Sequence, residues 1–134
     1  MSRENVEMVE RAIAAVNARD VDAYLACCTE NVSLLTPLAA IGGTYEGRRA
    51  IRRFFEDVAD TGPDFRLSLD DTEQLGSDRV LAFLRVSATG RASGIPGLRD
   101  RPATNVYDFD NGRIARVRIF LDRDEALKAV GLAE

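Results

Sequence analysis

The sequence contains no histidine, and its two cysteines, Cys27 and Cys28, are neighbours in the chain. Histidine is the commonest general base, the usual partner of a catalytic serine or cysteine, and the commonest metal ligand. Adjacent cysteines cannot easily bridge each other, so the pair fits a reducing compartment better than a disulfide framework. We therefore expect no hydrolytic triad, no metal and no cofactor, and a cytoplasmic location.

Long apolar runs and an excess of positive charge are also missing. No stretch approaches the roughly 20 apolar residues of a membrane span, and the first ten residues, MSRENVEMVE, lack the apolar segment of a signal peptide. The formal net charge is -4. Because an acidic protein on average repels nucleic acid and anionic membranes, we expect neither as a partner.

What is present fits one globular domain over residues 1–134. The chain is 46% hydrophobic and 30% charged, which is ordinary for a protein with a packed core. A chain of this length buries enough surface to fold without disulfides or metals. No internal repeat or linker divides it.

Helical periodicity marks three N-terminal segments. Apolar residues recur at helical spacing from Arg3 to Ala18, in a short stretch that Asp20 can cap, and over residues 47–59. The first two helices should form a hairpin.

The period changes to two after Pro63, which predicts strands. Phe65, Leu67 and Leu69 alternate with Arg66, Ser68 and Asp70, and further strands are predicted over residues 79–93, 103–109 and 113–121. Asn111-Gly112 reads as a tight hairpin turn, and Asp122 as the N-cap of a closing helix. The stretch NVSLLTPL adds a first strand.

These elements predict an α+β fold. A strongly curved antiparallel sheet would carry the helical hairpin and the third helix on one side, leaving a cone-shaped hollow beneath them. Such a hollow is a natural place for a ligand pocket.

Three stretches carry a family resemblance. They are VERAIAAVNARDVDAYLACCTENV, GTYEGRRAIRRFFEDV and DFDNGRIARVRIFLDRDEAL. Together with the order of elements they resemble the SnoaL-like branch of the nuclear transport factor 2-like superfamily, over nearly the whole chain. The resemblance implies a single SnoaL-like domain with a cystatin-like roll. It is a poor guide to function, since relatives include polyketide cyclases, ketosteroid isomerases, epoxide hydrolases and proteins of no known activity.

The resemblance also implies which strand faces point into the cone. The inward set would be Leu81, Phe83, Arg85, Ser87, Asn105, Tyr107, Phe109, Val117, Ile119 and Leu121, with Thr36 and Phe54 also lining the cavity. The alternate residues Val80, Ala82, Leu84, Val86 and Ala88 would then lie outside. Small apolar residues on an exposed face are best explained by contact with a second copy, so we expect a homodimer through this surface.

Positions that resemble the catalytic residues of ketosteroid isomerases are altered. The general-base position, before Pro37, carries Thr36, and the oxyanion-hole acid falls on Asn105, which can still donate a hydrogen bond. The oxyanion tyrosine falls on Ala12. Isomerase chemistry of that kind has therefore lost its base and half of its oxyanion hole.

Limonene-epoxide-hydrolase-like relatives use an Arg-x-Asp motif and a second aspartate. Here Arg85 keeps the arginine, Ser87 replaces the first acid and Ile119 stands at the second. Epoxide hydrolysis is therefore disfavoured. A buried guanidinium without its acids needs a partner, for which a ligand carboxylate, enolate or phenolate is suited. The alternative is an ion pair with an acid at the rim, or a head group that reaches water.

These considerations predict a protein that binds a mostly apolar, oxygenated small molecule. As an enzyme it would be a cofactor-independent cyclase or isomerase in which Arg85 and Asn105 stabilise an enolate. The predicted pocket residues are Tyr24, Thr36, Phe54, Phe83, Ser87, Tyr107, Val117 and Ile119. Ordinary local hydrogen bonding explains Asn105 and Ser87 equally well. For the two tyrosines, a buried side chain with one satisfied hydroxyl is the more frequent case. Residues 90–102 would form a mouth or simply a long turn. The alternative function is a non-catalytic small-molecule-binding or dimerisation domain that has lost the catalytic acids.

Overall fold

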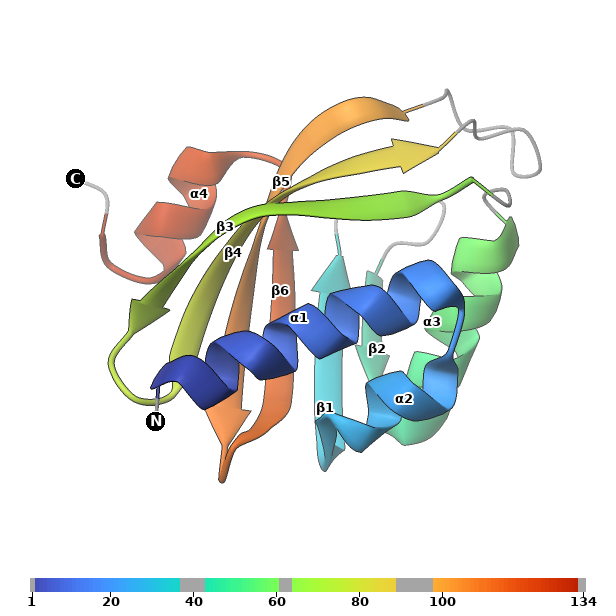
Figure 1. The fold of residues 1–134 in the computed structure, drawn as a ribbon, viewed down its shortest axis with the longest axis horizontal. Coiled ribbons are helices and arrows are strands. Elements are labelled where there is room, and N and C mark those ends of the chain that lie inside the picture. Colours follow the sequence, from blue (N-terminus) through green and yellow to red (C-terminus); the bar gives the residue numbers. More distant parts are fainter. Residues whose placement is uncertain (1, 37–42, 61–63, 89–97, 133–134) are drawn as a thin grey trace.

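The computed structural model describes residues 2–36, 43–60, 64–88 and 98–132. Their elements, in chain order, are α1 (Ser2–Ala18), α2 (Val21–Ala26), β1 (Cys28–Thr36), β2 (Gly43–Glu46), α3 (Arg48–Asp60), β3 (Arg66–Leu75), β4 (Arg79–Ala88), β5 (Leu98–Asp110), β6 (Arg113–Phe120) and α4 (Arg123–Ala129). The strands form one curved sheet in the order β2-β1-β6-β5-β4-β3 (Figure 1). Neighbouring strands are antiparallel except β1 and β6, which are parallel. The predicted α+β roll is confirmed, but the sheet, predicted to be antiparallel, is mixed because β1 and β6 pair in parallel.

Helix α1 lies across the sheet, and α2 and α3 lie beside β1 and β2 (Figure 1). The buried face of α1 includes Val9, Ala12, Ile13 and Val16, at the predicted helical spacing. The backbone N–H of Ala23 donates to the Asp20 carboxylate at 3.1 Å, so the predicted cap of the second helix is present. The helical hairpin follows from these local signals.

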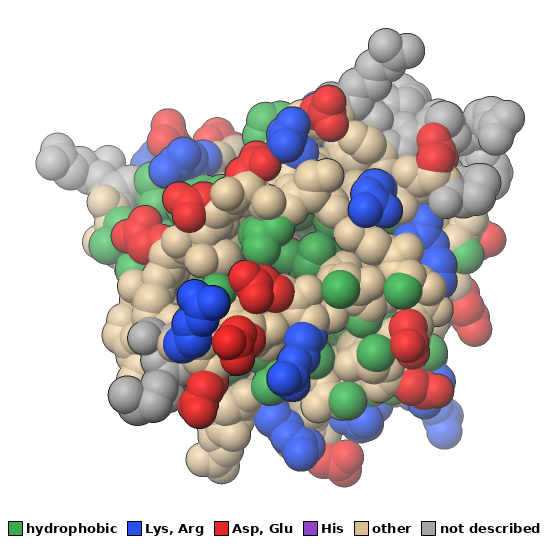
Figure 2. All heavy atoms as spheres, viewed as in Figure 1, with side chains coloured by type: hydrophobic (Ala, Val, Ile, Leu, Met, Phe, Trp, Pro, Cys, Tyr) green, Lys and Arg blue, Asp and Glu red, His purple; other side chains and the backbone are tan. Residues whose placement is uncertain are grey.

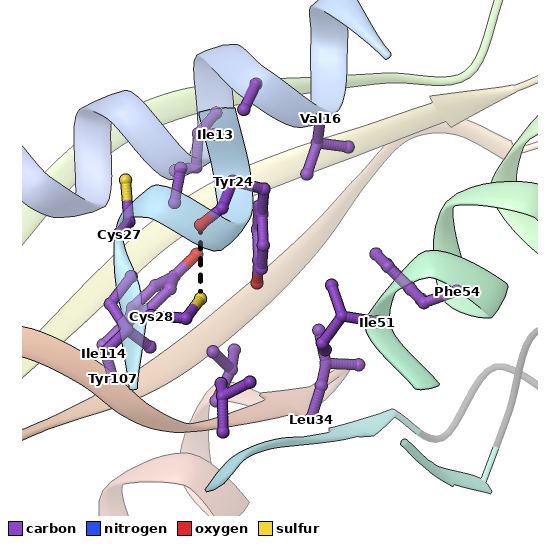
Figure 3. Packing of buried hydrophobic residues seen from close by; sticks show 14 of the residues in the cluster. Ile13, Val16, Tyr24, Cys27, Cys28, Leu34, Ile51, Phe54, Tyr107 and Ile114 are labelled. Carbon is purple, nitrogen blue, oxygen red and sulfur yellow. Dashed lines mark hydrogen bonds between the residues drawn. The ribbon is translucent and has the colours of Figure 1, made fainter. Parts of the chain in front are cut away.

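The two faces of the sheet are covered by different helices. The inner face lies against α1, α2 and α3 and forms the main core (Figure 3). The outer face carries a smaller cluster in which Leu81 and Val106 are buried with Ala126 of α4. Both faces of β4 and β5 are therefore apolar over part of their length.

Two short signals set the C-terminal end. Asn111 and Gly112 both have positive φ, 52° and 79°, as a type I′ turn between β5 and β6 requires. The backbone N–H of Asp124 donates to the Asp122 carboxylate at 2.9 Å, which makes Asp122 the N-cap of α4. Gly131 has φ 78° just after that helix.

The predicted facing of β4 was wrong. Val80, Ala82, Leu84 and Val86 belong to the main core of a single chain and are at most 5% exposed. They cannot form the predicted surface for a second copy, and the side chain of Ala88 lies outside the described residues. Dimerisation itself stays a prediction without an assigned surface.

Among the described residues, no helix is long and apolar enough to cross a membrane.

Candidate functional site

An interior cavity lies between α3 and the inner face of the sheet. Its apolar wall consists of Phe54, Phe65, Leu67, Leu84, Val86 and Ile119, and its polar lining residue is Asn105. Figure 2 shows hydrophobic side chains in a hollow between α1 and β3. The cavity volume is about 30 Å³, enough for about one water molecule. A larger ligand must therefore push the wall side chains apart.

Asn105 is the polar group that the fold brings to this cavity. It is 4% exposed, and its Nδ2 donates to the Tyr107 hydroxyl at 3.2 Å. Its Oδ1 is buried and has no hydrogen-bond partner among the described residues. Leaving a buried acceptor unpaired costs about 1–3 kcal/mol. A ligand hydroxyl or N–H that reached Oδ1 would remove this cost.

The amide can also present its other end. A primary amide has two donors and one acceptor, and a phenol both donates and accepts. If Tyr107 donates to the amide oxygen instead, the nitrogen of Asn105 becomes the free group. The same pair can therefore offer a ligand either an acceptor or a donor.

Tyr24 and Tyr107 are both buried in the main core (Figure 3). Burial raises the pKa of Tyr107 to about 12, although the hydrogen bond from Asn105 lowers it in part. Burial and the nearby Tyr107 raise the pKa of Tyr24 well above its ordinary value. Both phenols are therefore neutral at physiological pH, and neither is poised to act as a general base.

The two cysteines are free and buried. The thiol of Cys28 donates to the backbone oxygen of Tyr24 at 3.3 Å, as the dashed line in Figure 3 shows. Burial raises the pKa of Cys28 to about 12 and also raises that of Cys27. Neither thiol is prepared for nucleophilic attack, since the thiolate is the reactive form.

Most of the predicted pocket residues do lie on the inner side. Those in the main core or lining the cavity are Tyr24, Phe54, Asn105, Tyr107, Val117 and Ile119. Thr36 is buried at the end of β1, on the same face as Leu34. That any of these residues contacts a ligand stays a prediction.

The predicted inward positions of Leu81, Phe83, Arg85 and Ser87 were wrong; Leu81 and Phe83 belong to the outer cluster. Arg85 lies on the outer face with its side chain 45% exposed, and its Nε and Nη2 donate to Asp70 at 3.1 and 3.0 Å. The Ser87 hydroxyl donates to the Asp100 carboxylate at 3.1 Å, and Phe83 lies on the side covered by α4. Arg85 thus has an acid of its own chain, and the argument that it needs a ligand anion falls.

The sequence does carry a signal for this facing. Ser68 pairs with Arg85, and Arg66 with Ser87, across β3 and β4. Opposite residues on neighbouring strands share a face of the sheet. The polar residues of β3 that alternate with its leucines, Arg66 and Ser68, therefore lie on the same face as Ser87 and Arg85. That rule places Arg85 beside Asp70.

An arginine cluster on the outer face was also missed. Arg79, Asp108 and Arg116 stand opposite one another on β4, β5 and β6. Asp108 accepts from Arg79 at 2.6 Å, Arg116 at 2.9 Å and Arg118 at 3.4 Å. Burial acts to raise the pKa of Asp108, but the hydrogen bonds and charges of these arginines outweigh it and lower the pKa. A register shift between Asp108 and Phe109 brings Arg116 opposite Asp108, and the hairpin turn by itself would not have indicated that pairing.

In the described part of the chain, no three cysteine, aspartate or glutamate side chains gather as metal ligands would.

Comparison with known proteins supports the resemblance. The profile of the SnoaL-like domain matches residues 9–117. Bal32a, from a soil-derived mobile gene cassette, is 31% identical over 88% of each chain, with a TM-score of 0.77. A putative SnoaL-like polyketide cyclase from Jannaschia sp. CCS1 is 18% identical over 99% of this chain and 95% of its own, with a TM-score of 0.74. TerC, co-crystallised with polyporic acid, is 20% identical over 93% of this chain and 96% of its own, with a TM-score of 0.75. No curated protein matches.

Proposed function

Because the chain belongs to the SnoaL-like domain family, we propose that its cone binds a mostly apolar small molecule with Asn105 as the polar contact. The observation that carries this proposal is the buried, unpaired Oδ1 of a residue that lines an apolar cavity. Ligand sites are typically apolar hollows with a few placed polar groups. Buried polar groups without partners are uncommon in folded proteins, so this one calls for a partner.

Binding without chemistry is the form of the proposal that the site supports best. The described residues that line the cavity carry no charge, and the two nearby phenols stay protonated at physiological pH. Thr36 and Ile119 stand where the resemblance implies catalytic acids. An enolate could accept a hydrogen bond from the Asn105 amide, but proton abstraction needs a base, and the described lining residues include none.

The small cavity volume shapes the expected binding behaviour. A ligand of one or two rings exceeds about 30 Å³, so its binding must open the wall formed by Phe54 and Phe65. The ligand then selects or creates an expanded form of the interior. We expect the bound protein to differ from the free one mainly at these aromatic side chains.

Titration with a matched pair of ligands tests the proposal. 1-Naphthol offers a hydroxyl donor on an apolar body, and 1-methoxynaphthalene has the same body without the donor. Amide chemical shifts should show saturable binding of 1-naphthol, at least about tenfold tighter than that of the ether, a difference of about 1.4 kcal/mol. Polyporic acid is a useful third probe, because TerC was crystallised with it.

Variants assign the difference to Asn105. Asn105→Leu should remove the preference for the hydroxyl while keeping binding of the ether. Asn31→Leu, at an exposed position of β1, is the matched control and should leave both affinities unchanged. Equal affinity for the two ligands in the native protein, or an unchanged preference in Asn105→Leu, contradicts the proposal.

A turnover assay separates binding from catalysis. Exchange of the α-hydrogens of 2-tetralone with deuterium, followed by NMR, reports enolate formation. The proposal expects no acceleration over buffer. Acceleration that Asn105→Leu abolishes would instead establish the second candidate, a cofactor-independent isomerase or cyclase.

A further inference from the structure

A second hollow lies on the outer face of the sheet, beside the start of α4. Its volume is about 200 Å³, and its side chains include Asp70, Phe83, Arg85, Thr104, Leu121 and Arg123. Phe83 packs with the outer cluster, whereas the interior cavity lies on the other side of β4. Leu84 lines both hollows, whereas Phe83 and Arg85 line the outer hollow and not the interior cavity.

Arg123 gives this hollow an available cation. Its guanidinium carbon lies 4.3 Å from the centroid of the Phe83 ring. The Phe83 ring is the partner of Arg123, and no described residue forms a hydrogen bond or ion pair with the Arg123 side chain. Stacking occupies the face of a guanidinium and leaves its N–H donors pointing outward in the plane. Those donors match the two oxygens of a carboxylate.

Among the residues that line the hollow, the charge of Arg123 has no opposite partner. Arg85 and Asp70 neutralise each other through two hydrogen bonds, so the lining residues carry one excess positive charge, that of Arg123. Asp122, the residue before Arg123, accepts from the backbone N–H of Asp124 as the N-cap of α4 and is not in the lining of the hollow. The chain as a whole has a net charge of -4, so the positive charge at this hollow is a local feature.

Apart from Thr104, the remaining lining is apolar. It consists of Phe83, Leu84, Pro102, Ala103 and Leu121. The volume lies below the roughly 300–1,000 Å³ of pockets for drug-sized ligands, so it suits a single ring or a short chain. An anion without an apolar body would leave this wall uncovered.

We propose that the outer hollow binds a small aromatic carboxylate, with the carboxylate on the Arg123 guanidinium and the ring against the wall of Phe83 and Leu121. This proposal does not rest on the ligand proposed for the interior cavity, although Leu84 lines both hollows.

Titration with benzoate tests this site. Backbone amides of residues 83–85, 103–104 and 121–123 should shift saturably. Benzyl alcohol, which has the ring without the charge, and acetate, which has the charge without the ring, should each bind at least about tenfold more weakly. Raising the ionic strength from about 0.05 to about 0.5 M should weaken benzoate binding, because the contact is exposed and ionic.

A pair of arginine variants provides the control. Arg123→Gln should weaken benzoate binding at least tenfold, and Phe83→Leu should weaken it less. Arg53→Gln is the matched control, because Arg53 also stacks on an aromatic ring, with its guanidinium carbon 5.8 Å from the Tyr45 centroid, but is not in the lining of the outer hollow. It should leave benzoate affinity unchanged. Benzoate affinity unchanged in Arg123→Gln, shifts confined to the interior cavity, or no saturation would each overturn the proposal.

Discussion

Removing the Asn105–Tyr107 pair, one residue at a time and then together, measures how the interior is held. Tyr107→Phe leaves the amide nitrogen without its acceptor while the oxygen is already unpaired, so it should destabilise the protein by about 1–3 kcal/mol. Asn105→Leu removes the unpaired oxygen but leaves the buried Tyr107 hydroxyl without its hydrogen-bond partner. The two effects on the free energy of unfolding should nearly cancel. The double variant replaces both polar groups with apolar ones of similar shape.

The double variant should be as stable as the native protein, or more stable by about 1 kcal/mol, because no polar group is left unpaired. The coupling between the two changes is then about 2 kcal/mol, well above the value for independent sites. Urea denaturation checks this, with an unchanged m-value required so that the midpoints report stability. For a chain of this size the double variant should differ from Tyr107→Phe by several degrees in Tm.

Two results would refute the reasoning. A loss above about 2 kcal/mol in Asn105→Leu alone would mean that its oxygen has a strong partner in the native protein. Additive effects would mean that Asn105 and Tyr107 do not share the hydrogen bond. Asn31→Leu, exposed on β1, again serves as the control for the chemical change.

Three further outcomes are expected. Arg85→Ala should change Tm by less than about 2 °C in a thermal melt, because the arginine is half exposed on the outer face. It should also leave the affinity for 1-naphthol unchanged. Loss of that affinity would mean that Arg85 does belong to the interior site. Asp108→Asn should cost about 2 kcal/mol in urea denaturation, after allowance for solvent screening, because three arginines then face one another. The pKa of Asp108 is lowered by folding, so its stabilisation is complete above about pH 4 and is lost as pH falls toward the folded value; that acid-side slope should shrink in Asp108→Asn. Cys27 and Cys28, with raised pKa values, should resist a thiol reagent at pH 8 until urea unfolds the chain, and fast native labelling would contradict their burial.

The fold could be predicted because its signals are local. Helical spacing predicted α1 and α3, Asp20 and Asp122 predicted the N-caps of α2 and α4, and Asn111-Gly112 predicted the hairpin between β5 and β6. Each of these depends on a few neighbouring residues whose conformational preferences are strong. The parallel pairing of β1 with β6 joins distant segments, and no local pattern carries it.

The facing of β4 could not be predicted from β4 itself. Leu81 and Phe83 are apolar because α4 covers the outer face, so alternation within the strand does not distinguish inside from outside. Only the neighbouring strand resolves the ambiguity, since β3 has one polar face and its register with β4 is fixed. Because the facing of β4 was predicted wrongly, Arg85 was expected inside the cone and was expected to bind a ligand anion there.

The corrected facing separates two kinds of chemistry by pH. The interior contact is an amide beside phenols whose pKa values are raised, so nothing on its described lining titrates between about pH 5 and 9, and affinity for 1-naphthol should be flat there. The outer contact is a guanidinium, which keeps its charge throughout, so benzoate should lose affinity only when its own carboxylate is protonated, below about pH 4. A benzoate affinity that fell between pH 6 and 8 would point to another titrating group in the outer hollow. Because the two ligands differ in charge and in the polar group that each contacts, Asn105 or Arg123, occupancy of one hollow can be measured in the presence of the other ligand.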